Sequence, residues 1–142
     1  MKHLLAAACL ALPACVAVAH SRLDTAWRGE AHPGVMSNLA FDLDGKARWD
    51  FELPAGRETY ELNYVLARNP DHEFLNQTSP GSFLDFSGFD RGPLAGKTLY
   101  GIAHWDEETL LYEAAAGDPG EGGDVVRPKA FTDQARRFQR VR

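Results

Sequence analysis

The stretch from Ser37 to Leu53 decides the fold, and it reads Ser-Asn-Leu-Ala-Phe-Asp-Leu-Asp-Gly-Lys-Ala-Arg-Trp-Asp-Phe-Glu-Leu. Apolar and polar residues alternate on both sides of Asp44-Gly45, and a period of two is typical of a β-strand with one buried face. Asp-Gly between two such runs is a frequent hairpin turn. The stretch therefore predicts a β-hairpin whose apolar residues are Leu39, Phe41, Ala47, Trp49, Phe51 and Leu53.

The parity of the two runs predicts the register of this hairpin. A two-residue turn at Asp44-Gly45 would place Phe41 opposite Arg48, and the two apolar sets would then lie on opposite faces. A three-residue loop instead places Phe41 opposite Ala47 and puts Gly45 in the left-handed position of a β-bulge. We therefore expect the bulged hairpin.

The same alternation continues along the chain, interrupted by turn residues. Strands are expected at residues 60–66, 98–105, 109–114 and 136–142, and weaker ones at 74–75 and 82–86. No segment after the N-terminal one shows a helical stripe, although residues 130–137 could form one helical turn. Successive hairpins favour a meander, and closure into a barrel removes exposed sheet edges. We predict an all-β domain: a small antiparallel up-and-down barrel of about eight to ten short strands.

Residues 1–19 are predicted to be a cleaved signal peptide. A basic start at Lys2 precedes an apolar run that ends in the small-x-small pattern Ala17-Val18-Ala19. The run is shorter than the ~20 residues of a membrane-spanning helix. We therefore expect a secreted or periplasmic protein whose barrel domain covers residues 20–142, with cleavage after Ser21 as the alternative.

Both cysteines of the chain, Cys9 and Cys15, lie within this N-terminal segment. Leu12-Pro13-Ala14-Cys15 is similar to a lipobox, so a lipoprotein attached to the membrane through Cys15 is an alternative. The domain that follows has no cysteine and must be stabilised by its core. Thiol catalysis and cysteine-based zinc sites are excluded in that domain.

Short motifs in the second half carry a family resemblance. They are, in order, a strand centred on Asp85, Gly96-Lys97-Thr98, Gly101-Ile102, Thr109-Leu110 and Arg127-Pro128-Lys129-Ala130-Phe131. This succession resembles a family of small secreted bacterial domains, abundant in planctomycetes, over about residues 24–142. The resemblance implies a lipocalin-like barrel and no established function.

Trp27 and Arg140 fit a further feature of lipocalin-type barrels, in which an arginine of the last strand often caps a tryptophan of the first. The guanidinium would then lie over the indole face. The alternative is a core tryptophan and a solvated arginine.

The chain contains none of the short motifs that mark hydrolases, P-loop proteins or zinc proteases. Its formal net charge of −5 argues against nucleic-acid binding. We therefore expect a noncatalytic protein without a cofactor that binds a ligand or a partner.

Two sets of residues are candidates for binding. A small apolar ligand inside the barrel would contact Trp49, Tyr60, Tyr64, Tyr100 and Trp105, although short strands favour a barrel filled by its own side chains. Residues 127–142 carry six basic side chains against one acidic one. An acidic envelope partner would contact Arg127, Arg136, Arg137 and Arg140, and intramolecular ion pairing is the alternative.

Two hypotheses of other classes remain open. Cleavage after Ala19 would make His20 the N-terminal residue, whose amino group and imidazole can chelate copper. The chain would then be a copper-binding protein or a metal-dependent enzyme. The other hypothesis is a structural component of the cell envelope.

Overall fold

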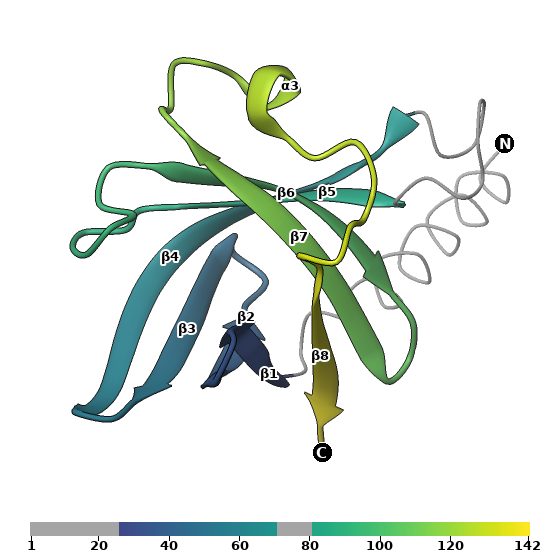
Figure 1. The fold of residues 1–142 in the computed structure, drawn as a ribbon. Coiled ribbons are helices and arrows are strands. Elements are labelled where there is room, and N and C mark those ends of the chain that lie inside the picture. Colours follow the sequence, from purple (N-terminus) through teal and green to yellow (C-terminus); the bar gives the residue numbers. More distant parts are fainter. Residues whose placement is uncertain (1–25, 71–80) are drawn as a thin grey trace, which may run out of the picture.

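A computed structural model describes residues 26–70 and 81–142 of the chain as a closed barrel (Figure 1). Each strand pairs with the next in antiparallel fashion, and the last pairs with the first. The predicted all-β, up-and-down antiparallel barrel is therefore confirmed, with eight strands. They are β1 (Ala26–His32), β2 (Val35–Phe41), β3 (Lys46–Leu53), β4 (Gly56–Arg68), β5 (Ser82–Ser87), β6 (Thr98–Trp105), β7 (Thr109–Gly117) and β8 (Arg136–Val141).

Three features predicted from the sequence lie outside the described residues. They are the signal peptide with Cys15, the candidate copper ligand His20 and the weaker strand at residues 74–75.

The β2–β3 hairpin has the predicted register and loop. Phe41 pairs with Ala47, and Gly45 has a φ of 79°, which is the left-handed conformation that glycine adopts without strain. The Asp42 carboxylate accepts a hydrogen bond of 2.9 Å from the backbone N–H of Lys46. The three-residue loop predicted from the parity of the two strands is therefore confirmed. The alternative register would have exposed one set of apolar side chains to water.

One end of the barrel, which we call the closed end, carries the 42–45 and 106–108 turns and is filled with aromatic rings. The ring of Phe41 lies 5.1 Å from that of Tyr64, 6.0 Å from that of Phe86 and 6.3 Å from that of Trp105. Trp27 is 1% exposed at this end. The expectation of a barrel filled by its own side chains is confirmed here.

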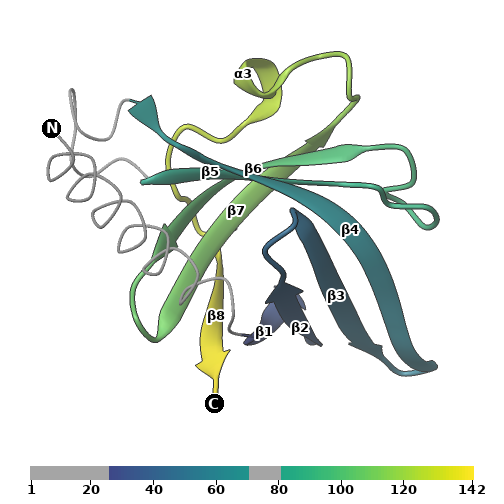
Figure 2. The same ribbon diagram turned by 180° about the vertical axis from the view of Figure 1, so that it is seen from behind.

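Residues 118–135, which join β7 to β8 and which we call the crossover segment, cover part of the outer wall. They include α3, a four-residue helix at Gly123–Val126, beside the wall formed by β5, β6 and β7 (Figure 1 and Figure 2). The helical turn considered for residues 130–137 does not form. A single turn closes instead, with a 3.2 Å hydrogen bond from Ala135 N–H to the Thr132 carbonyl, and β8 follows.

The last strand, β8, closes the barrel through two short seams. Residues Ala26–Gly29 of β1 pair with it on one side, and Thr109–Tyr112 of β7 pair on the other, four residue pairs in each case. Gly29 faces Phe138 across the first seam. An added Cβ at Gly29 would lie 3.0 Å from both the Cα and the ring of Phe138, so the closure depends on this glycine.

Trp27 and Arg140 lie opposite each other in this seam, but the predicted cap does not form. The Arg140 guanidinium donates to the Glu107 carbonyl at 3.3 Å. The cation–π contacts found among the described residues involve Arg91 and Arg127. Trp27 is a core residue, as the alternative has it, whereas Arg140 is held by the Glu107 carbonyl and is not simply solvated.

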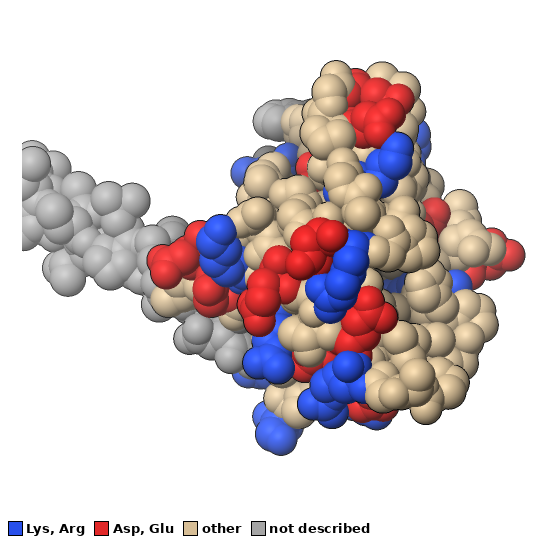
Figure 3. All heavy atoms as spheres, turned by 90° about the vertical axis from the view of Figure 1, so that its left-hand side faces the viewer, with Lys and Arg blue, Asp and Glu red and all other residues tan. Residues whose placement is uncertain are grey.

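Charges on the outer surface are mixed. Figure 3 shows acidic and basic side chains interspersed over one face of the barrel. Ion pairs of this kind join Arg28 to Glu52 at 2.8 Å and Arg48 to Asp50 at 3.2 Å. Exposed pairs of this type contribute little to stability, typically below about 1 kcal/mol.

Candidate functional site: a cavity at the open end of the barrel

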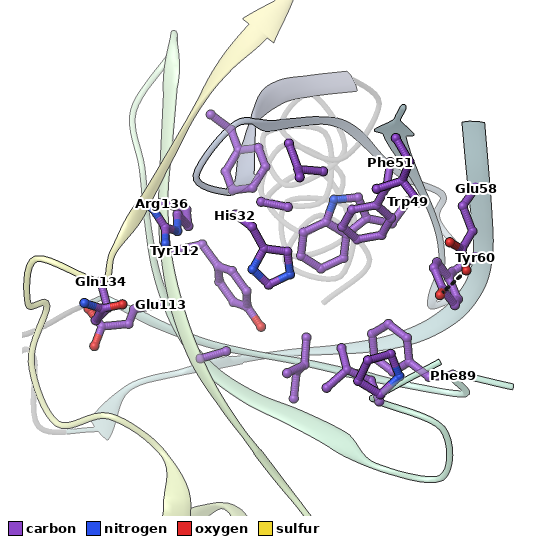
Figure 4. Close-up of a pocket in the computed structure, with 18 residues that line it drawn as sticks. His32, Trp49, Phe51, Glu58, Tyr60, Phe89, Tyr112, Glu113, Gln134 and Arg136 are labelled. Atoms are coloured by element: carbon purple, nitrogen blue, oxygen red, sulfur yellow. Dashed lines mark hydrogen bonds between the residues drawn. The ribbon is translucent and has the colours of Figure 1, made fainter. Parts of the chain in front are cut away.

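The opposite end, which we call the open end, contains a cavity of about 510 Å³. Its volume falls within the ~300–1,000 Å³ range of small-molecule sites. Trp49, Phe51, Tyr60 and Phe89 form one side of the cavity, and Tyr112 stands on the other (Figure 4). The barrel is therefore filled at one end and hollow at the other.

Small residues at two inward positions of the open end leave room for the cavity. Ala31 of β1 and Ala114 of β7 line it. Ala114 pairs with Gly101 of β6, and an added Cβ at Gly101 would lie only 2.5 Å from the hydroxyl oxygen of Tyr112. The length of the strands does not predict the cavity, because the cavity depends on which side chains point inward at the open end.

A chain of aromatic rings makes up the β3–β4 side of the cavity. The Trp49 and Phe51 rings stack at 5.2 Å, Phe51 meets Tyr60 edge-on at 5.6 Å, and Tyr60 meets Phe89 at 5.6 Å. Such ring pairs hold one another in place. The Nε1 atom of Trp49 is buried and has no hydrogen-bond partner among the described residues.

The charges on this side are already paired. The Tyr60 hydroxyl donates to the Glu58 carboxylate at 2.5 Å, and Arg91 lies 3.5 Å from the same carboxylate and 4.3 Å from the centre of the Tyr60 ring. The hydrogen bond to Glu58 and, after it, burial raise the pKa of Tyr60 above its usual value. Tyr60 is therefore a neutral phenol at physiological pH.

The opposite side carries an arginine whose side chain has no partner within residues 26–70 and 81–142. Arg136 of β8 lies opposite Tyr112 of β7 and lines the cavity (Figure 4). Its side chain is partly buried, and it makes no hydrogen bond or ion pair with the described part of the chain. The neighbouring Glu113 carboxylate accepts the backbone N–H of Thr132 at 2.7 Å and its hydroxyl at 3.0 Å.

The structure brings two of the five predicted ligand-binding aromatics to the cavity, Trp49 and Tyr60. Tyr64 and Trp105 pack against Phe41 at the closed end. Tyr100 lies on the outer face of β6, where its hydroxyl donates to the Asp118 carbonyl at 3.3 Å. The prediction missed Phe51, Phe89 and Tyr112, although the parity of Phe51 with Trp49 could have indicated the first of these.

The four predicted partner-binding arginines do not form one surface. Arg127 is only 11% exposed and pairs with Asp85. Arg136 lines the cavity, and Arg137 points outward and is exposed. Arg140 is held at the closed end by the Glu107 carbonyl. The basic segment is therefore divided between the outside of the wall, the cavity and the closed end.

Three motifs of the family resemblance meet outside the barrel around Arg127. Its guanidinium donates to both carboxylate oxygens of Asp85, at 2.5 and 3.0 Å, and to the Gly101 carbonyl at 2.8 Å. The Gly101 N–H donates to Asp85 at 3.1 Å, and the Arg127 Cζ lies 4.2 Å from the centre of the Phe83 ring. These residues fix the crossover segment to the wall, so their role is structural.

Residues 26–70 and 81–142 hold no group of three or more His, Cys, Asp or Glu side chains placed to bind a metal ion. Within the same ranges, no helix has the length and apolarity needed to span a membrane.

Comparison with known proteins gives no match among family models, curated proteins or solved structures. The family resemblance and the export of the protein therefore stay predictions.

Proposed function

We propose that this protein is an exported, noncatalytic barrel that binds a small, mainly apolar ligand in the cavity at its open end. The cavity is the observation that carries the proposal, because its volume suits a small molecule. Apolar side chains contribute most of its lining, among them Val35, Leu53, Leu94 and Leu99. Transfer of apolar ligand surface from water into such a lining drives binding.

The aromatic side of the cavity supports the same proposal. Rings held by their neighbours offer a large contact area without losing much rotamer freedom on binding. Because Glu58 is hydrogen-bonded to Tyr60 and ion-paired with Arg91, its charge on the β3–β4 side is compensated.

Titration with Nile red, a neutral dye that fluoresces in apolar surroundings, tests the proposal. The protein should bind one dye molecule. Ala114→Phe, which fills the cavity from β7, should weaken this binding by at least about tenfold. Ala40→Phe is the matched control, because Ala40 is exposed on the outer face of β2. It should bind the dye as the wild type does.

Native mass spectrometry of the protein isolated from its own host provides a second readout. A bound small molecule that Ala114→Phe abolishes supports the proposal. No dye binding by a folded wild-type barrel would contradict it and favour a structural role in the cell envelope. The copper hypothesis rests on His20, outside the described residues, and N-terminal sequencing of the exported protein tests it.

A further inference from the structure

The proposed function leaves one feature of the cavity unused, the guanidinium of Arg136. A charged side chain withdrawn from water is costly unless another group pairs with it. Arg136 is partly buried at the cavity and has no partner in the described part of the chain. It lies on β8 opposite Tyr112, so its side chain is directed to the inner face of the barrel.

The acidic side chains that line the cavity are engaged elsewhere. Glu58 accepts the Tyr60 hydroxyl at 2.5 Å, and Arg91 lies 3.5 Å from it. Glu113 accepts both the N–H and the hydroxyl of Thr132 in the crossover segment. His32, the other titratable group at the rim, is exposed. Glu113 keeps its negative charge, but Thr132 holds its carboxylate, and no ion pair within the described part of the chain joins it to Arg136. Among the residues that line the cavity, Arg136 is the only Lys or Arg.

We propose that Arg136 binds a negatively charged group of the ligand, so that the cavity selects an amphiphile with one anionic head and an apolar body. This inference rests on the proposed function and adds the chemical class of the ligand. A guanidinium offers two parallel N–H donors, which match the oxygens of a carboxylate or a phosphate. The apolar body would lie against the aromatic chain from Trp49 to Phe89.

Displacement of Nile red by ligands that share one decyl chain tests this inference. Decanoate and decyl phosphate carry an anionic head, decanol a neutral one and decyltrimethylammonium a cationic one. All are used below their micelle concentrations at neutral pH. At least one anionic ligand should displace the dye at about tenfold lower concentration than decanol, and added salt should narrow the difference. Comparison of the two anionic ligands distinguishes a carboxylate from a phosphate.

Arg136→Gln should abolish this preference. It should lower the affinity for the anionic ligand about tenfold and leave the affinity for decanol unchanged. Arg136→Lys should keep part of it, because the charge remains and the paired donors are lost. Arg137→Gln is the matched control, since the neighbouring side chain is exposed on the outer face and should have no effect.

The outcomes separate the inference from the function beneath it. Three results would overturn the inference and leave apolar binding intact. They are equal affinity for decanol and both anions, tightest binding of the cation, and an equal loss of affinity for all ligands in Arg136→Gln. If the wild type binds neither Nile red nor any of the decyl ligands, the proposed function itself is overturned.

Discussion

At the scale of single residues, side-chain size decides where the barrel is solid and where it is hollow. Gly101 is the clearest case, because its missing Cβ leaves room for the ring of Tyr112 to lie across β6 on the inner face of the barrel. A Cβ there would lie 2.5 Å from the Tyr112 hydroxyl and 2.6 Å from the Leu84 carbonyl oxygen. Both neighbours are fixed, since the Tyr112 hydroxyl donates to that same carbonyl at 3.2 Å. The tyrosine cannot give way without losing this bond.

Gly101→Ala should therefore destabilise the protein by about 1–3 kcal/mol, because the added methyl group overpacks a rigid region. Urea unfolding followed by tryptophan fluorescence measures the change. Gly120→Ala is the control: a Cβ at Gly120 meets nothing within 4 Å, and its effect should stay within about 0.5 kcal/mol. Equal stabilities for the two variants would contradict the packing argument.

Tyr112 also gives the barrel a dependence on alkaline pH. Burial, and after it the charge of Asp85, raises the pKa of the Tyr112 hydroxyl well above 10.0. The folded state therefore keeps a proton that the unfolded state loses above about pH 10. This contribution is complete below the unfolded pKa and falls as pH rises, by up to about 1.4 kcal/mol per pH unit.

Tyr112→Phe should remove this part of the alkaline decline, while losing about 1 kcal/mol at neutral pH with the hydrogen bond to Leu84. Unfolding free energies between pH 8 and pH 11.5 measure both effects. Tyr60 and Tyr64, whose pKa values are also raised, keep their share of the decline. Parallel curves for wild type and variant would show that Tyr112 does not titrate as described.

At the scale of elements, a largely buried ion pair between Arg127 and Asp85 holds the crossover segment to the wall, in addition to an exposed pair between Lys97 and Asp118. Arg127 is 11% exposed and Asp85 20% exposed, so removal of one partner leaves the other buried and unpaired. Three of the motifs that carry the family resemblance, those with Asp85, Gly101 and Arg127, thus secure a surface segment of the fold.

Arg127→Ala should cost about 3 kcal/mol, in the range found when a buried ion pair loses one member. Arg48→Ala is the matched control, because Arg48 is 56% exposed in its pair with Asp50 and should cost less than about 1 kcal/mol. Urea unfolding compares the two. Similar costs would mean that Arg127 does not secure the crossover segment.

Elements also differ in how far the sequence predicts them. The β2–β3 register follows from parity, since only one face of these strands is apolar. On β6 both parities are apolar: Leu99 points inward, whereas Tyr100 and Ile102 are buried on the outer face by the crossover segment. The sequence alone predicts that Tyr100 points into the barrel, because the pattern does not show that residues 118–135 pack over the outer face of β6. The periodicity predicts which side chains share a face of a strand, but it does not predict which other segment covers that face.

At the scale of the whole molecule, topology was predictable and the cavity was not. Consecutive antiparallel strands bounded by turns lead to a meander, and the unpaired edges favour closure. The cavity is lined by small residues from β1 and β7, which are far apart in the sequence, and their meeting requires the register of the entire ring. The same holds for Arg136, whose inward direction follows from its pairing with Tyr112.

The seams of the ring should differ in local stability. β8 pairs with each neighbour over four residues, whereas β3 and β4 pair over eight. Local opening of β8 should therefore require less free energy than opening of the β3–β4 pair. Native-state hydrogen exchange measures this at the backbone amide of Phe138 against that of Leu62, both of which are fully or nearly fully buried. Equal protection of the two amides would show that the barrel opens as one unit.

From the position of β8 in the ring, we expect the β1–β8 pairing to form last. β1 to β7 form by joining neighbours in the chain, which carries a small loop-closure cost, whereas the β1–β8 pairing joins residues separated by almost the whole domain. Synthesis from the N-terminus supplies this strand after the other seven. Until it arrives, β1 and β7 both present unpaired backbone groups, the kind of edge that recruits other chains. The interval before ring closure is therefore when a nascent molecule is most exposed to aggregation and most in need of a chaperone.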